Sequence, residues 1–209
     1  MVTQTQILNT LTYLMGERTV PSTALEGRKD FIQRSLEEVY RAYPWAFAGT
    51  KTGLTLVDGV ATLPSDFDDQ HKIYAYFYSG DNQYQVEEVN IGDNDMYEDG
   101  SHKFWLETDN LGTYTIHTKD TGYTDITVKY QKIAPTLSDS IDTPFNDRLT
   151  IALGAKRYVK MGQNPDADVS QDEALFQKRL NENIAASQVN RPLRKHRAVY
   201  KANGYHLGE

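Results

Sequence analysis

Cysteine is absent from the 209 residues, and no apolar run approaches the length of a membrane-spanning helix. Without cysteine the chain has no disulfide bonds, no thiolate nucleophile and none of the cysteine-based zinc sites. Because a spanning helix needs about 20 apolar residues in succession, we expect no membrane segment. Residues 1–6 show no basic stretch leading into an apolar core, so we also expect no signal peptide.

The motifs of common enzymes are also missing. The sequence has no Gly-x-Gly-x-x-Gly, no phosphate-binding P-loop and no Gly-x-Ser-x-Gly. His102, Glu107 and His117 are close enough in sequence to meet across a hairpin, but a polar sheet face is the simpler explanation for them. The acidic run 93–99 lacks the glycine and glutamate of a calcium-binding loop. We therefore predict no catalytic residue, no metal site and no cofactor: the chain is not expected to be an enzyme.

Charge is distributed unevenly along the chain, whose net charge is −7. Residues 1–190 contain 17 basic and 28 acidic residues, whereas residues 191–209 contain five basic residues and one acidic residue. The last segment therefore carries +4 against −11 on the rest. A basic end on an acidic protein favours an acidic partner.

The spacing of apolar residues changes twice. Helical spacing before Pro44 and after Thr143 predicts two helices on each side, while alternation between them predicts six or seven short strands. Asp58-Gly59 is a hairpin signal within the strand region. Each expected helix start has a residue whose side chain can cap the first turn. These capping residues are Thr3, Thr23, Thr143 and Ser170.

We therefore predict an α+β fold: a helical bundle formed by the N- and C-terminal helices, an inserted small antiparallel β module and an extended C-terminal arm. The bundle comprises residues 1–48 and 142–190 and the β module residues 49–132. Residues 133–141 form a linker, and residues 191–209 form the arm. Small residues in the third predicted helix (Ala152, Gly154 and Ala155) favour close helix packing that continues across subunits.

The sequence Tyr-Pro-Trp-Ala-Phe-Ala at 43–48 is followed at 54–67 by a hairpin pattern that ends in Leu-Pro-Ser-Asp-Phe. This combination resembles head-to-tail adaptor proteins of tailed bacteriophages, the neck or tail-tubular-protein-A-like group. In that group a helix ends in Pro-Trp-x-Phe-Ala, a hairpin follows and Leu-Pro-x-Asp-Phe closes it. The close match covers the 25 residues 43–67, and the order of helices and strands extends it to most of the chain.

The resemblance implies a structural virion protein, assembled in the host cytoplasm and located in the neck. Twelve copies would form a ring beneath the portal protein, with double-stranded DNA passing through its channel without sequence recognition. A downstream tail or nozzle protein would bind the other side of the ring. A C-terminal arm would reach up to the portal.

Two groups of residues are candidates for these contacts. Trp45, Phe47 and Phe67 are expected to anchor the β module on the bundle, with ordinary core packing as an equal alternative. In the arm, basic and apolar residues interleave, which favours docking into an acidic groove over contact with DNA. The predicted portal-binding residues are Arg191, Leu193, Arg194, Lys195, Arg197, Tyr200 and Tyr205.

Two other functions stay open. Fourteen tyrosines and an aromatic-rich strand region are compatible with a carbohydrate-binding tail module, which an exposed line of tyrosine and tryptophan on one sheet face would favour. A small carboxylate-dependent hydrolase would need two carboxylates roughly 5–9 Å apart in a pocket. Asp66 is expected to bond a backbone N–H two residues on rather than to act in catalysis.

Overall fold

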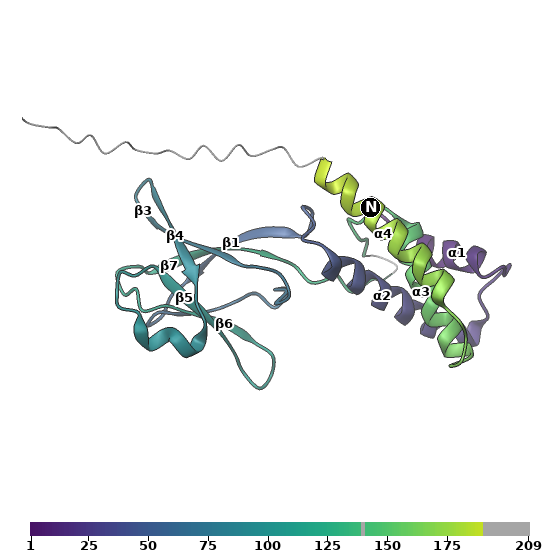
Figure 1. Cartoon of the computed structure of the whole chain (residues 1–209), viewed down its shortest axis with the longest axis horizontal. Helices are drawn as coiled ribbons and strands as arrows, with labels where there is room; N and C mark the ends of the chain where they lie inside the picture. The colour runs from purple at the N-terminus through teal and green to yellow at the C-terminus, as the bar shows by residue number, and fades with distance from the viewer. Residues whose placement is uncertain (139–140, 190–209) are drawn as a thin grey trace, which may run out of the picture.

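The computed structural model describes residues 1–138 and 141–189 of the chain. The molecule is elongated, with the helices gathered at one end and the strands at the other (Figure 1). Helices from both ends of the sequence pack together, because two precede the strands and two follow them. These helices are α1 (Gln4–Leu14), α2 (Leu25–Ala42), α3 (Arg148–Gln163) and α4 (Ser170–Val189), with a 3-10 turn η1 (Ser22–Ala24) before α2.

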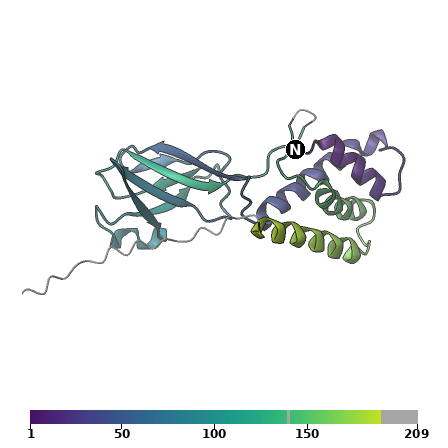
Figure 2. The ribbon, with the colours of Figure 1, turned by 90° about the horizontal axis from the view of Figure 1, so that it is seen from above.

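The strands form one seven-stranded sheet in the order β1-β7-β3-β4-β5-β6-β2. Its two end strands, β1 and β2, contact each other, so the sheet curls into a nearly closed barrel (Figure 2). A 3-10 segment, η2 (Ile91–Met96), lies in the connection from β4 to β5. The strands are β1 (Gly49–Thr55), β2 (Val60–Thr62), β3 (Tyr74–Ser79), β4 (Asn82–Glu88), β5 (Lys103–Thr108), β6 (Tyr114–His117) and β7 (Asp125–Gln131).

The predicted fold class is therefore wrong. In place of a helical bundle carrying a small antiparallel module, the structure has four helices and a seven-stranded mixed, barrel-like sheet. The mixed character comes from β4 and β5, which pair in parallel. Parallel neighbours need a crossover of about a dozen residues or more, and residues 89–102 supply it through η2. The predicted domain boundaries stay a prediction.

Each end of the molecule has its own hydrophobic core. The helical core contains Ile7, Leu36, Trp45, Ile151 and Phe176, among others. The barrel core is formed by the inward-facing residues of the strands, with Phe77, Phe104 and Ile126 fully buried. The helices and the barrel therefore each bury their own apolar side chains within one subunit.

Helix starts follow local hydrogen bonding, and only one of the four predicted caps is confirmed. Thr3 and Gln6 form the expected capping box at α1. Helix α3 is capped by Asp147 rather than Thr143, whose hydroxyl oxygen instead accepts from the N–H of Phe145 at 3.1 Å. Helix α2 follows η1 and has no side-chain cap. At α4 it is Asp168 that accepts from the N–H of Ser170, at 2.9 Å.

Asp58-Gly59 forms the expected tight turn, with Val57 and Val60 bonded to each other in both directions. Both turn residues have positive φ, 51° and 78°. A Cβ on Gly59 would lie 2.3 Å from the carbonyl oxygen of Thr118, so no other residue fits there without movement. Beyond the turn the strands separate, because β2 pairs with β6 and β1 pairs with β7.

The small residues of α3 pack against helices of the same chain, not against another subunit. Ala152 and Ala155 are fully buried in the helical core. A Cβ built on Gly154 would lie 2.1 Å from the hydroxyl oxygen of Ser35 in α2 and 3.0 Å from the ring of Phe176 in α4. Gly154 therefore sets the distance of α3 from both neighbouring helices, and it gives no support to an intersubunit contact.

Candidate interaction surfaces

Trp45 lies at the joint between the helices and the barrel. Its side chain is only 1% exposed, and its indole N–H donates to the carbonyl oxygen of Val39 at 2.6 Å. That carbonyl belongs to the last turn of α2, so the indole binds the end of this helix. The ring also packs edge-on against Phe145, with centroids 5.2 Å apart, and thereby links the end of α2 to the segment that enters α3.

Phe47 stacks on Trp45 with ring centroids 5.7 Å apart, but it is 39% exposed. It lines a groove of about 550 Å³ between the joint and α4. Phe145 and Arg179 lie on the walls of this groove, and Ala186 of α4 borders it. The structure therefore brings two of the three predicted anchor residues together, on the helical side of the joint.

Phe67, the third predicted anchor, lies elsewhere. It belongs to the barrel core and packs edge-on against Tyr114 and Tyr130, with centroids 5.3 and 5.9 Å away. The adjacent Asp66 accepts from the hydroxyl of Tyr130 at 2.7 Å and pairs with Lys132 at 2.8 Å. The predicted Asp66 turn is wrong.

Asp68 makes that turn instead, by accepting from the N–H of Gln70 at 3.0 Å.

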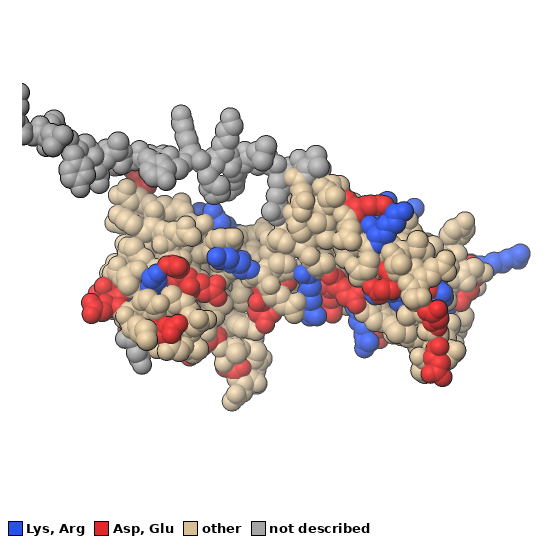
Figure 3. Space-filling view, viewed as in Figure 1, with Lys and Arg blue, Asp and Glu red and all other residues tan. Residues whose placement is uncertain are grey.

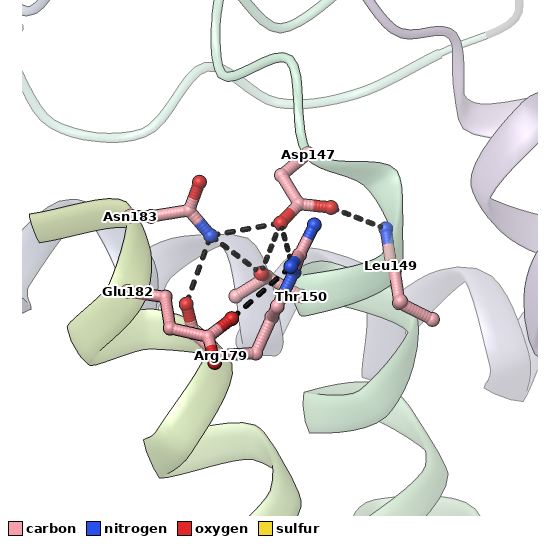
Figure 4. Close-up of polar contacts among 6 residues, drawn as sticks. All are labelled: Asp147, Leu149, Thr150, Arg179, Glu182 and Asn183. Atoms are coloured by element: carbon pink, nitrogen blue, oxygen red, sulfur yellow. Dashed lines mark hydrogen bonds and ion pairs between the residues drawn. The ribbon is translucent and has the colours of Figure 1, made fainter. Parts of the chain in front are cut away.

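A polar cluster holds α4 against the start of α3 beside the groove (Figure 4). One oxygen of Asp147 accepts from the N–H of Leu149 at 3.1 Å, which caps α3. The other oxygen accepts from Thr150 at 2.9 Å, from Arg179 at 2.7 Å and from Asn183 at 2.8 Å. One carboxylate therefore caps one helix and ties a second helix to it. The capping role of Asp147 was missed because Thr143-Pro144 offered a stronger helix-start pattern.

The environment of Asp147 shifts its ionisation. Burial raises the pKa of this carboxyl, but hydrogen bonds from Asn183 and Thr150 and the charge of Arg179 outweigh that effect and hold it below its usual value. A lowered pKa in the folded state means that the stabilisation is complete above the unfolded pKa, about 3.9, and is lost as pH falls through the folded value.

We expect Asp147→Ala to lower the free energy of unfolding at pH 7 by about 1–2 kcal/mol, the usual cost of a lost helix cap. The deficit relative to the native chain should shrink below about pH 4, because this carboxyl binds a proton there in the unfolded chain before it does so in the folded one. Urea unfolding at pH 7, 5 and 3 measures both effects. Asp81, which is exposed at the β3–β4 turn, provides a control through Asp81→Ala. If Asp147→Ala lowered the free energy of unfolding by the same amount at pH 3 as at pH 7, the charge of Asp147 would not contribute to stability.

The candidate metal ligands do not converge. His117 lies 3.8 Å from Glu107 and is stacked on Trp105, whereas His102 is 3.3 Å from Asp120 instead. Within residues 1–138 and 141–189, no group of three or more histidine or acidic side chains is placed to hold a metal ion. Glu107 and His117 share a sheet face on the paired strands β5 and β6, whereas His102 precedes β5 and packs against aromatic rings.

A surface that sequence patterns did not single out covers β1, β7 and β3 on the outside of the barrel. We call it the Tyr–Lys face. It carries three tyrosines in one line along β3, each with a lysine ammonium over its ring. The pairs, with ammonium-to-centroid distances, are Lys72–Tyr74 at 5.6 Å, Lys129–Tyr76 at 4.7 Å and Lys51–Tyr78 at 5.2 Å.

The predicted portal-binding residues, from Arg191 to Tyr205, lie outside the described residues. Their segment follows directly on α4, which ends at Val189 beside the groove. No helix in the described part of the chain is long and apolar enough to cross a bilayer. The sequence matches no protein-family model and no curated protein.

Proposed function

We propose that the chain is a structural subunit of a tailed-phage neck, a head-to-tail adaptor that assembles as a ring beneath the portal. In this role it joins the capsid to a tail or nozzle protein, and double-stranded DNA passes through the ring without being recognised. The subunit performs no chemistry. It contributes shape and surfaces for neighbours.

The joint at Trp45 is the observation that carries the proposal. The residues behind the resemblance, Pro-Trp-x-Phe-Ala, lie between α2 and β1, where Trp45 connects the end of α2 to the segment that enters α3. Tyr43, the residue after α2, is extended and Pro44 follows it, so the helix ends here and the chain continues toward β1. A subunit with two separate cores suits the wall of a ring, in which each copy must hold one shape.

Assembly tests this proposal directly. We expect electron microscopy and mass photometry of the purified chain, alone or mixed with its portal, to show closed rings with twelve-fold symmetry. The mass should correspond to a multiple of the 23.8 kDa subunit. A protein that stays monomeric in both conditions would refute the adaptor function.

The arm provides a second test. Residues 192–209 can span at most about 60 Å when extended, which is enough to reach from one ring into another. We expect deletion of these residues to abolish portal attachment while leaving the circular dichroism spectrum and thermal midpoint unchanged. A control chain should carry a Gly/Ser segment of equal length in their place, so that length and sequence are separated. Normal portal attachment by the truncated chain would remove the arm from the interface.

Carbohydrate binding is a second candidate, because Tyr74 and Tyr78 on one sheet face are 45% and 42% exposed. The two tryptophans are buried, however, and each tyrosine ring of the Tyr–Lys face already has a lysine over it. A stacked sugar would have to displace these lysines or use the opposite ring face. Calorimetry with host surface polysaccharides tests this alternative, and heat that disappears in Tyr74→Ala/Tyr78→Ala would favour it over a purely structural role.

A further inference from the structure

We propose that the Tyr–Lys face of one subunit docks the acidic η2 segment, residues 88–99, of a second copy of this chain. The inference rests on the proposed function and deepens it, since it names the two surfaces that meet between neighbours in the ring. The reasons lie in the positive charge of the face, the opposite charge of the segment and the positions of the two on the barrel.

The Tyr–Lys face is positively charged and hollowed. Lys51 and Lys129 lie opposite each other on paired strands, and Tyr74 lies opposite Lys129 on the next strand. Together with Lys72 they line a hollow of about 340 Å³. Three lysines thus line one shallow hollow, next to rings that supply apolar contact area.

The ammonium of Lys51 donates a hydrogen bond to the neutral hydroxyl of Tyr78 at 3.2 Å, in addition to its contact with a tyrosine ring. In the described part of the chain no ion pair joins Lys51, Lys72 or Lys129 to a carboxylate, whereas Lys103 and Lys132 are paired with Glu87 and Asp66. The carboxylates nearest the face lie at its edges. Glu87, beyond Lys72, is bonded to Lys103, and Asp125, at the far end of β7, accepts from Thr55 and Thr124.

The concentration of lysines on this face is unusual for the barrel. Residues 49–132 contain six lysines, no arginine and 15 acidic residues, so their net charge is −9. Half of the lysines are on the Tyr–Lys face. Acidic subunits repel one another unless a positive patch of one meets a negative patch of the next. The Tyr–Lys face is such a positive patch.

The acidic η2 segment has the complementary character. Residues 88–99 contain five acidic residues and no basic residue. Glu88 and Glu98 are exposed, and two apolar side chains beside them are also exposed, Ile91 at 53% and Met96 at 79%. Carboxylates with exposed apolar side chains fit a surface of ammonium groups and tyrosine rings, because tyrosine and methionine are enriched at interface centres and charges at the rim.

The acidic η2 segment and the strands β1 and β7 of the Tyr–Lys face lie on different sides of the barrel. In Figure 2, η2 is at the lower edge of the barrel while β7 and β1 run along the opposite edge. The side that carries η2 faces the viewer in Figures 1 and 3, where carboxylates are scattered over it. Lys72 lies where the two surfaces adjoin, because it lines a hollow with Glu88 and Asp93 of the same subunit. Lys51 and Lys129 belong to β1 and β7 on the opposite edge, so their contact with the acidic η2 segment of a second copy is head-to-tail. Head-to-tail contacts form a ring when the rotation between copies closes and an open filament when it does not.

Charge reversal on each side tests the pairing. One variant carries Lys51→Glu and Lys129→Glu, and the other carries Glu88→Lys and Glu98→Lys. Each variant alone places like charges at the contact, and we expect its self-association to weaken by at least about a hundredfold in sedimentation velocity or mass photometry. A 1:1 mixture of the two restores opposite charges at every contact, so we expect assembly to return with the two variants alternating.

A charge control and a folding control accompany these variants. Lys178→Glu on the exposed side of α4 is the control for an added negative charge, and circular dichroism checks that all variants fold. If the reversed variants form rings as the native chain does, the inference is wrong while the adaptor function stands. If the native chain forms no ring at all, both fail. If the Lys51→Glu/Lys129→Glu variant assembled normally but no longer retained DNA, the proposed contact between subunits would also be wrong. The Tyr–Lys face would then be a nucleic-acid contact.

Discussion

Replacement of Trp45 by alanine is expected to lower the free energy of unfolding by about 3–5 kcal/mol, the usual cost of removing a large aromatic side chain from a core. The indole is buried at the joint, contacts Phe47 and Phe145 and satisfies the carbonyl of Val39. Since domains are stable by only about 5–15 kcal/mol, the loss would be a large fraction of the total. Urea unfolding followed by far-ultraviolet circular dichroism measures it.

Two further variants separate the causes. Trp45→Phe keeps most of the ring but removes the N–H donor, and should cost about 0.5–1.5 kcal/mol through the lost hydrogen bond to Val39. Phe47→Ala removes a partly exposed ring from the same stack and should cost less than Trp45→Ala. A Trp45→Ala protein within 1 kcal/mol of the native chain would show that the joint is not held by this residue, and would weaken the adaptor proposal.

Helices and turns were predictable where the signal is local. Helical spacing placed four helices, and the sequence Thr3-Gln4-Thr5-Gln6 predicted a capping box that the structure contains. Asp58-Gly59 predicted a turn, because few other pairs accept positive φ at both positions. The position of the α3 start was missed since the cap depends on Asp147, whose other partners come from α4.

Strand order was not predictable, because it depends on contacts between segments far apart in the chain. Hairpin signals suggested that neighbours in sequence pair, yet β1 lies beside β7 and β2 beside β6. The parallel pair β4–β5 depends on a crossover that carries no strong sequence pattern. The same limit affected the site: Trp45 and Phe67 are 22 positions apart along a shared motif but belong to different cores.

The Tyr–Lys face could not be predicted from the alternation of residues along β3 alone. The run Tyr74 to Tyr78 has aromatic or apolar residues on both sides, so its buried side could be assigned only by the pairing with β7. That pairing places Ala75 and Phe77 inside and leaves the three tyrosines outside with Lys51 and Lys129. A surface of this kind exists only after the sheet is assembled.

Replacement of Gly154 by alanine is expected to destabilise the protein by about 1–3 kcal/mol or more, the usual cost of overpacking a core. On helix propensity alone the change would stabilise α3 by about 1 kcal/mol. Packing decides the sign, because the new Cβ would lie 2.1 Å from the hydroxyl oxygen of Ser35 and 3.0 Å from both its Cβ and the ring of Phe176. Helix α3 must then move away from α2 and α4, and thermal or urea unfolding measures the cost.

Gly27 in α2 is the matched control for this substitution. It is exposed and a Cβ there meets nothing within 4 Å, so Gly27→Ala should raise the free energy of unfolding by up to about 1 kcal/mol. Ser35→Ala removes the oxygen that clashes most, at the loss of its hydrogen bond to Ile151, so the double variant Ser35→Ala/Gly154→Ala should lose less than the sum of the two single variants. Additive losses, or a Gly154→Ala protein as stable as Gly27→Ala, would mean that α3 has room to shift and that Gly154 does not set the distance between these helices.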